Sequence, residues 1–392
     1  MNSVPLLELS GSPRSRGVTH GRALAGRLRG FLDDSLARLG HLSDRPMDLD
    51  SLRPGIAAHR EVVAAVLPGL ADEVDGLAVG AGIERDEAWL LQLRRELLGY
   101  SRVTAGDCST YASVRNRPVL AQTVDLNGNL DDQIALLAVS GPGRRSLVLS
   151  FAGLLGYLGL NDAGIAVGIN LVLGGDWTPG VPPYLAIRHV LDSAGTVDEA
   201  VAMLTALPLA SSRSFMVCGR ERVVCVEALG TQRRLIEGDE LAHTNHFLHP
   251  DLLARDEINI FAKNSSRRRL EAVRAALVLD PDDTDGHHRL LSVPPVLVAD
   301  NGDIRRERTV AAVMMRPDRG ELRLWPGDPS TAGELVYSLR PGDRPVLVHG
   351  GRGSEGEQGG KRAVHSRGHG RTIPRSLAAQ GAFGDAESPT RP

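Results

Sequence analysis

Cys108 is the residue of this chain whose surroundings most favour nucleophilic chemistry. It lies in the segment Ala105-Gly106-Asp107-Cys108-Ser109-Thr110-Tyr111-Ala112. A cysteine taken alone is more often a small buried apolar residue than a nucleophile. Here a Gly-Asp turn precedes the cysteine and a strand of small residues follows it. Cys108 also marks the point where a helical part of the sequence gives way to a part rich in strands, so a catalytic thiol is favoured.

A thiol needs a base nearby before it becomes a good nucleophile, because its ordinary pKa is about 8.5. Cleavage of the Asp107–Cys108 bond would create an α-amino group with a pKa of about 7.7–8.0 on Cys108 itself. None of the twelve histidines lies in a recognisable Cys–His signature. The sequence therefore favours a chain that cuts itself before Cys108 and then uses one residue as both nucleophile and base.

The other two cysteines, Cys218 and Cys225, flank a turn between two predicted strands and are interpreted as structural. Their spacing is not the CxxC of common metal sites, so no metal site is expected there. His365 and His369 lie in a Gly- and Arg-rich tail and are interpreted as solvated rather than metal-binding.

The composition is that of an ordinary globular chain, with 392 residues, 42% hydrophobic, 24% charged and a net charge of −3. No basic excess is present to neutralise a phosphate backbone, and aromatic residues are only 4%, so nucleic acid is not an expected partner. The N-terminus lacks the pattern of a signal peptide, and no apolar run approaches the roughly 20 residues of a membrane span. We expect a cytoplasmic protein without a membrane anchor.

Helical periodicity dominates the first hundred residues, after a short strand at Leu6–Leu9. Helical stretches are predicted at 18–39, at 62–77 with a break or new start at Pro68, and at 86–98. After Cys108 short Val-, Leu- and Ile-rich runs alternate with Gly, Asn and Asp turns. The predicted strands are 119–124, 134–139, 146–151, 165–171, 215–218, 223–227, 309–314, 321–325 and 334–338. Helices are predicted at 184–191, from Thr196, where Thr196 and Glu199 form a capping box, and from about Ser266. We predict one catalytic domain over 1–340 and a disordered tail over 341–392, whose last apolar run is Val346–Val348.

Seven short motifs occur in an order that makes the set more specific than any one of them. The chain opens with Gly11-Ser12-Pro13, followed by Gly17 and His20-Gly21, and the later motifs are Gly106–Ala112, Gln122–Asp125, Asn161–Asn170, Gly180–Arg188, Thr244–His246 with Ser265–Arg268, and Gly327–Pro329. With this set, the chain resembles the acyl-coenzyme A:6-aminopenicillanic acid acyltransferase family, cysteine N-terminal-nucleophile hydrolases related to the bile-salt and penicillin V hydrolases. The likeness runs from about Gly11 to Leu339.

The resemblance implies roles for four residues besides Cys108. Asp125 resembles the aspartate that holds the new α-amino group, although it could also open the turn at Asn127-Gly128. Asn245 resembles the oxyanion-hole asparagine, with a turn-capping asparagine as the alternative. Asn170 resembles an asparagine that lines the same pocket. Arg268 resembles an arginine that faces the nucleophile, although Arg267 fits the register too and an exposed helix arginine is the alternative.

Two further histidines, His20 and His246, match the family pattern and are interpreted as structural. One departure from the pattern concerns cleavage, because the family usually has Gly immediately before the nucleophile and this chain has Asp107. Glycine tolerates a strained scissile peptide most readily, so Asp107 bears on the efficiency of cleavage more than on its site.

The resemblance implies an α+β fold, the four-layer α/β/β/α sandwich of N-terminal-nucleophile hydrolases, and a cleavage that leaves chains 1–107 and 108–392 associated. It implies acyl transfer through a thioester, with no metal or organic cofactor. The pocket walls are expected on loops such as 173–181 and 247–264. The expected partner is a small acyl amide or acyl thioester, with amide hydrolysis ahead of transfer to a second amine, and a homo-oligomer is compatible with the sequence. A non-catalytic binding protein of the same fold is the competing hypothesis, and a classical Cys–His protease lacks its local signature.

Overall fold

The computed structural model describes residues 4–99, 108–141 and 143–339, and the side chain of Ala276 is not among the described ones. All elements below belong to one compact unit. Asp107, the predicted boundary near 340, the run Val346–Val348, and the tail with His365 and His369 lie outside the described residues. The predicted domain division therefore stays a prediction.

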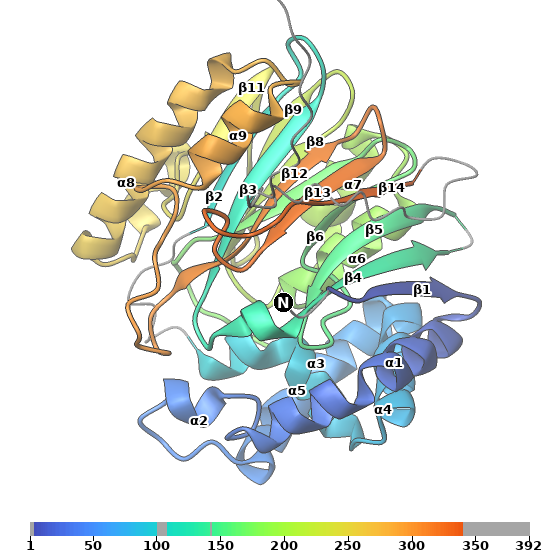
Figure 1. Cartoon of the computed structure of the whole chain (residues 1–392). Coiled ribbons are helices and arrows are strands. Elements are labelled where there is room, and N and C mark those ends of the chain that lie inside the picture. Colours follow the sequence, from blue (N-terminus) through green and yellow to red (C-terminus); the bar gives the residue numbers. More distant parts are fainter. Residues whose placement is uncertain (1–3, 100–107, 142, 340–392) are drawn as a thin grey trace, which may run out of the picture. The chain divides into compact units, whose positions relative to one another are not determined.

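The segment before Cys108 is a strand followed by a layer of helices (Figure 1). The elements are β1 (Leu6–Ser10), α1 (Pro13–Asp33), α2 (Leu39–Leu42), α3 (Leu49–Val66), α4 (Pro68–Ala81) and α5 (Arg85–Leu98). The α1 and α4 helices pack so closely that a Cβ atom at Gly17 would overlap the carbonyl oxygen of Glu73, and one at Gly21 would overlap that of Leu77. These contacts explain Gly17 and Gly21, two of the three glycines of the N-terminal motif.

The segment after Cys108 forms two sheets. One has the strand order β1-β4-β5-β6-β7-β8-β9-β10 and the other β11-β2-β3-β12-β13-β14. The strands are β2 (Ser109–Ser113), β3 (Val119–Leu126), β4 (Ile134–Ser140), β5 (Arg145–Phe151), β6 (Leu158–Asn161), β7 (Ala166–Leu171), β8 (Arg213–Cys218), β9 (Val223–Leu229), β10 (Gln232–Gly238), β11 (Glu240–His243), β12 (Arg308–Arg316), β13 (Glu321–Pro326) and β14 (Leu335–Ser338). Only β1 and β4 pair in parallel among these described strands, and the other pairs are antiparallel.

The two sheets pack face to face, because β2 and β3 of the smaller sheet contact β7 and β8 of the larger one. Helices α6 (Pro183–Ser193) and α7 (Val197–Ala206) cover the outer face of the larger sheet, and α8 (Ile260–Ala275) and α9 (Thr284–Leu291) cover that of the smaller sheet (Figure 1). Short 3-10 turns lie at Leu130–Gln133, Pro250–Arg255 and Ala276–Val278. The predicted α+β fold, a four-layer α/β/β/α sandwich, is confirmed.

A buried glutamine joins the two sheets next to the predicted nucleophile. The side chain of Gln122 on β3 donates from Nε2 to the Ile169 carbonyl at 2.7 Å, and its Oε1 accepts from the Ile169 amide at 3.0 Å. A Cβ at Gly168 would lie only 2.7 Å from Gln122 Oε1, so glycine leaves the room that this contact needs. The result fixes the end of β7, and with it Asn170, against the strand that carries Asp125.

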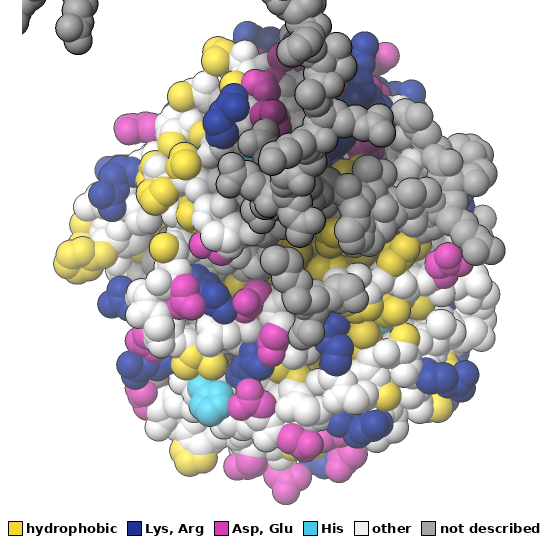
Figure 2. All heavy atoms as spheres, viewed as in Figure 1, with side chains coloured by type: hydrophobic (Ala, Val, Ile, Leu, Met, Phe, Trp, Pro, Cys, Tyr) yellow, Lys and Arg dark blue, Asp and Glu magenta, His cyan; other side chains and the backbone are white. Residues whose placement is uncertain are grey.

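The outer surface shows no concentration of one charge on the face in view. Figure 2 shows Lys and Arg side chains interspersed with Asp and Glu, and hydrophobic side chains scattered among them. Among the described helices, none is long and apolar enough to cross a membrane.

Candidate active site

The Cys108 thiol is buried between the two sheets, at the start of β2. Its Sγ lies 3.8 Å from the backbone carbonyl oxygen of Asp125 and 3.8 Å from the Tyr157 hydroxyl. Burial and the nearby Asp125 carboxylate raise the pKa of the thiol to about 12. In the uncut chain the thiol is therefore neutral at physiological pH, and attack on a carbonyl requires a base to remove its proton.

Asp125 approaches Cys108 because β2 and β3 pair antiparallel with Ser109 opposite Thr123. The Thr123 hydroxyl contacts Asp125 Oδ2 at 3.4 Å and accepts from the Ser109 amide at 3.3 Å. Asp125 is 3% exposed and lines the same pocket as the thiol. The carboxylate thus lies in the pocket of the thiol, close enough for its charge to raise the pKa of Cys108.

The carbonyl group of Cys108 is held by two side chains. Asn170 donates to it from Nδ2 at 2.9 Å, and Arg269 donates from Nη1 at 2.9 Å. Arg269 also donates to the Ser109 hydroxyl at 3.0 Å. Asn170 therefore positions the backbone of Cys108, which is a more specific contact than lining the pocket.

Asn245 is oriented by the same arginine. Its Oδ1 accepts from Arg269 Nη2 at 2.9 Å, while its Nδ2 donates to the Leu171 carbonyl at 2.9 Å. Because a guanidinium only donates, it fixes which end of the amide is oxygen. Asn245 lines the pocket with Cys108, and the amide nitrogen retains a second N–H beyond the one that bonds Leu171.

The loop that carries Asn245 is fixed from both sides. The Ser266 hydroxyl accepts from the backbone N–H of Asn245 at 2.8 Å and bonds His246 Nδ1 at 2.7 Å. The Glu227 carboxylate bonds His243 Nε2 at 2.8 Å and accepts from the Leu248 amide at 2.6 Å. These contacts hold Asn245 in place through residues of three elements, β9, β11 and α8.

His246 and His20 have no place among the groups around the thiol. Burial is the main cause that lowers the pKa of His246 to about 4 and that of His20 to about 3, so both rings are neutral. His20 lies on the buried face of α1 and has no hydrogen-bond partner for either ring nitrogen within the described part of the chain. Both positions agree with the structural role predicted for them.

The arginine prediction at Arg268 is wrong by one position. Arg267 and Arg268 are exposed, whereas Arg269 is fully buried and reaches Cys108 and Asn245. Ser266, Arg269, Leu270 and Val273 form the buried face of α8, which is the i, i+3, i+4, i+7 pattern of a helix. The apolar residues Leu270 and Val273 carry the signal that could have selected Arg269 from the sequence.

A pocket opens beside the thiol and brings together residues from distant segments. Its walls include Arg95 of α5, Tyr157, Tyr184 of α6, Arg213 of β8 and Glu307, in addition to Cys108, Asp125 and Asn245. None of these first five was predicted as a site residue. Tyr184 lies within the motif Gly180–Arg188 but was not singled out, and the other four lie in no motif, so only the fold shows that all five line one pocket.

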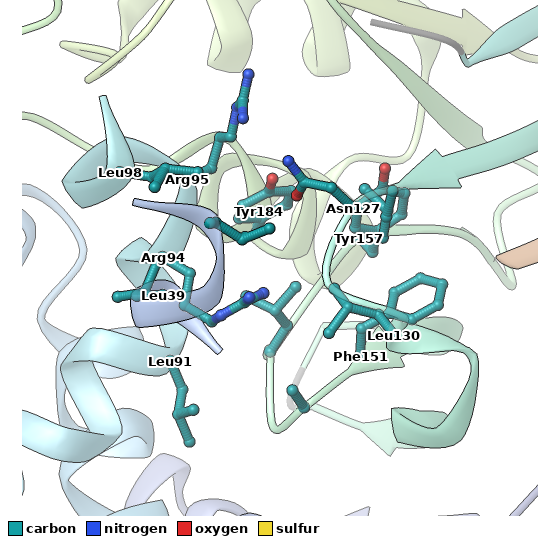
Figure 3. A pocket seen from close by; sticks show the side chains of 14 residues that line it. Leu39, Leu91, Arg94, Arg95, Leu98, Asn127, Leu130, Phe151, Tyr157 and Tyr184 are labelled. Carbon is teal, nitrogen blue, oxygen red and sulfur yellow. The ribbon is translucent and has the colours of Figure 1, made fainter. Parts of the chain in front are cut away.

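A second, largely apolar cavity adjoins this pocket and shares Arg95, Leu126, Asn127, Tyr157 and Tyr184 with it. Figure 3 shows its lining, with the leucines and Phe151 around the cavity and Tyr157 and Tyr184 beside Asn127. The two tyrosine rings stack with centroids 5.4 Å apart. The loops 173–181 and 247–264, where the pocket walls were expected, contribute to neither cavity.

Cys218 and Cys225 lie on the neighbouring strands β8 and β9, where both are buried and unoxidised. Burial raises the pKa of both thiols, to about 12 for Cys225. Neither lines the pocket. In the described part of the chain, no group of three or more His, Cys, Asp or Glu side chains is arranged to hold a metal ion.

Three comparisons with known proteins bear on this site. The family model of acyl-coenzyme A:6-aminopenicillanic acid acyl-transferase matches residues 113–325. A relative from Emericella nidulans, the acyl-coenzyme A:6-aminopenicillanic-acid-acyltransferase 40 kDa form, is 27% identical over 271 residues, which are 66% of this chain and 73% of the relative.

Two solved structures are similar at lower levels. Penicillin V acylase from Agrobacterium tumefaciens has a TM-score of 0.41 and 16% identity, over 59% of this chain and 86% of that one. A mutant of conjugated bile acid hydrolase from Clostridium perfringens has a TM-score of 0.38 and 9% identity, over 59% of this chain and 97% of that one. The family assignment depends on the family model, which spans more than half of the chain, from the end of β2 into β13. The predicted resemblance is confirmed, and the chain belongs to the acyl-coenzyme A:6-aminopenicillanic acid acyltransferase family.

Proposed function

We propose that this protein is an amidohydrolase that cleaves itself between Asp107 and Cys108 and then hydrolyses a small N-acyl amide through a Cys108 thioester. One observation carries the proposal. The Cys108 carbonyl is held by Asn170 and Arg269, while its thiol shares a pocket with the Asn245 amide. A buried thiol with a purely structural role would not need its backbone and a facing amide fixed by the same arginine.

The proposed mechanism starts from the amine that cleavage would create. Asp125 would keep this amine close to the thiol and stabilise its ammonium form. The amine takes the thiol proton, and the thiolate attacks the substrate carbonyl. The remaining N–H of Asn245 donates to the oxygen as negative charge develops on it, and such a donor contributes about 3–4 kcal/mol. The ammonium then protonates the leaving amine, and water hydrolyses the thioester.

Transfer to a second amine is the alternative outcome of the same acyl-enzyme. It is favoured by the name of the Emericella nidulans relative, which describes an acyltransferase with an acyl-coenzyme A donor. Amide hydrolysis stays first because it needs only water as the second reactant, whereas transfer also needs an amine bound beside the acyl-enzyme. Supplying a small amine during turnover and measuring its acylated product distinguishes the two acceptors.

The test combines mass measurement with activity. Denaturing mass spectrometry of the purified protein should show two chains, and N-terminal sequencing of the larger should begin Cys-Ser-Thr. Cys108→Ala should give one uncut, folded and inactive chain. Cys218→Ala is the matched control, because it also removes a buried thiol, and it should be cut and active. A fully active enzyme that remains one chain would contradict self-cleavage, and an active Cys108→Ala would contradict the choice of nucleophile.

A further inference from the structure

Arg95 is a partly buried cation at the pocket that the proposed mechanism does not use. It lies on α5, before Cys108 and outside the residues that the family model matches. It lines both the pocket of Cys108 and the adjoining apolar cavity. Its Nε and Nη2 atoms are buried and have no hydrogen-bond partner within the described part of the chain. Two donor nitrogens of one guanidinium are thus left unsatisfied beside the thiol.

The neighbouring charges do not satisfy these donors. Arg213 has its own partner, since its Nη2 lies 3.1 Å from Glu96 Oε1, and that oxygen also accepts from the Ser211 hydroxyl at 2.8 Å. Glu307 lies close enough to raise the pKa of Arg95, but it accepts no hydrogen bond from Arg95 Nε or Nη2. Burial acts in the opposite direction and is the larger cause, so the pKa of Arg95 is lowered. Glu307 thus supplies a nearby negative charge, but among the described residues these two nitrogens lack a hydrogen-bond acceptor.

A planar guanidinium with two available N–H groups is the protein group that best matches the two oxygens of a carboxylate. Leaving such donors buried and unsatisfied is unfavourable, so sites of this kind are typical of places where a ligand supplies the acceptor. The apolar cavity, with Leu39, Leu91 and Phe151 in its walls, offers the acyl chain a separate place. We propose that Arg95 binds a carboxylate on the amine portion of the substrate, so that the enzyme acts on N-acyl amino acids in preference to neutral amides.

This inference rests on the proposed function, and it also assigns a task to the segment before Cys108. If the chain is cut there, the smaller product would supply the specificity residue while the larger one supplies the nucleophile. The smaller chain would then be required for substrate choice as well as for folding.

The experiment compares N-hexanoyl-L-alanine with N-hexanoyl-L-alaninamide, two probes that differ only in having a carboxylate or a neutral carboxamide at the end of the alanine. Purified wild-type enzyme should release hexanoate from the acid with a kcat/KM about 10- to 100-fold higher than from the amide, which is the range that one charged hydrogen-bonded contact provides. Arg95→Met should abolish this preference, mainly by raising KM for the acid, without lowering the melting temperature. Arg95→Lys keeps the charge and should restore part of the preference.

Arg94 provides the matched control. It is the adjacent arginine and is also partly buried, it lines only the apolar cavity of the two, and its Nε donates to the Ala37 carbonyl at 2.8 Å. Figure 3 shows the two guanidinium groups pointing in different directions. Arg94→Met should change turnover of both probes by the same factor and leave their ratio intact.

Calorimetric binding of both probes separates the two proposals. Equal binding and equal turnover of acid and amide by the wild-type enzyme, or a preference that survives in Arg95→Met, would overturn the inference. Binding of the acid that depends on Arg95, with no hexanoate released from either probe, would support the inference and contradict amide hydrolysis as the function.

Discussion

Two arginines with buried nitrogens, the fully buried Arg188 and the partly buried Arg95, show opposite ways of placing a guanidinium in this protein. Arg188 on α6 donates from Nη2 to Glu73 Oε2 at 3.2 Å and from Nε to Asp192 Oδ1 at 2.8 Å, and its Nη1 forms an ion pair with Glu73 Oε1 at 3.0 Å. Arg95 has two buried nitrogens without any hydrogen-bond partner among the described residues. The first arginine is saturated by the protein, whereas the second has donors to offer a ligand.

The saturated arginine belongs to a network that joins three helices. Arg16 of α1 lies 2.7 Å from Glu73 of α4, which in turn binds Arg188 of α6. Arg188 also donates to the Leu155 carbonyl at 3.3 Å, close to the loop that carries Tyr157. The comparison teaches that burial of a charge does not by itself indicate function, and that the informative feature is a set of unsatisfied donors on a residue that lines a pocket.

The largest effect on stability is expected where the saturated network is broken. Glu73→Ala leaves Arg16 and Arg188 buried without their shared counter-charge, and such losses cost about 3–5 kcal/mol of unfolding free energy. Chemical denaturation should show this loss. Asp198→Ala is the control, because it removes an exposed partner of Arg222 and should cost about 1 kcal/mol or less. A small loss of unfolding free energy in Glu73→Ala would mean that the network contributes little to stability, contrary to what its geometry indicates.

The largest effect on catalysis after loss of Cys108 is expected at Asn245. Asn245→Ala should lower kcat by about 10²–10³-fold with a smaller change in KM, because the donor acts on charge that exists only in the transition state. Asn245→Asp should be worse, since it places a carboxylate against the developing oxyanion. A turn-capping asparagine would behave differently, because Asp caps nearly as well as Asn. Near-normal kcat in Asn245→Asp would remove this residue from the mechanism.

A smaller but cleanly controlled effect is expected from adjacent arginines of α8. Arg269→Ala removes the donors that hold the Cys108 carbonyl and Asn245 Oδ1, and we expect kcat/KM to fall by about 10- to 100-fold. Arg268→Ala removes an exposed guanidinium next to it and should stay within about 0.5 kcal/mol of wild type in stability, with unchanged kcat. Kinetics and melting curves of both variants decide between the two positions. Equal losses in both would contradict the assignment to Arg269.

The smallest expected effect is a loss of folding stability at acidic pH. The pKa of His246 is about 4 in the folded protein and near 6.5 when unfolded, so the unfolded chain binds more protons below pH 6.5. Stability is therefore full above pH 6.5 and declines as the pH falls toward 4, by about 1 kcal/mol between pH 6.5 and 5.5. His20, whose folded pKa is about 3, adds a loss of the same sign beside Arg188. Unfolding of His246→Gln across this range should show a shallower decline, and an unchanged slope would contradict this origin.

The sequence was sufficient for the parts of the fold that rest on local pattern. Strands such as 134–139 and 223–227 and the helix ending at Leu98 match the observed elements within a few residues. The short strand β6 and the edge strands β10 and β11 were missed, because they are brief or lack the apolar alternation that marks a half-buried strand. Their existence depends on partners elsewhere in the sheets.

The candidate site likewise contains residues that the sequence identified and residues that it did not. Cys108, Asp125, Asn170 and Asn245 were named from motifs, and the structure brings them together, although their catalytic roles stay proposals. Arg269 was missed by one residue, because three consecutive arginines leave the register open until the buried helix face is considered. Arg95 could not be found from sequence, since its significance comes from Arg213 and Glu307, which lie more than a hundred residues away in the chain.

The parallel pairing of β1 with β4, from Leu6 opposite Leu136 to Ser10 opposite Ser140, has a consequence for the lifetime of the enzyme. If the chain is cut before Cys108, this strand and the Glu73–Arg188 contact become bonds between two polypeptides. Folding of the precursor is a unimolecular reaction, whereas reassembly of the cut protein is bimolecular and depends on concentration. Once denatured and diluted, the mature enzyme should recover more slowly than its uncut precursor. Its activity would then depend on the single round of folding that preceded cleavage.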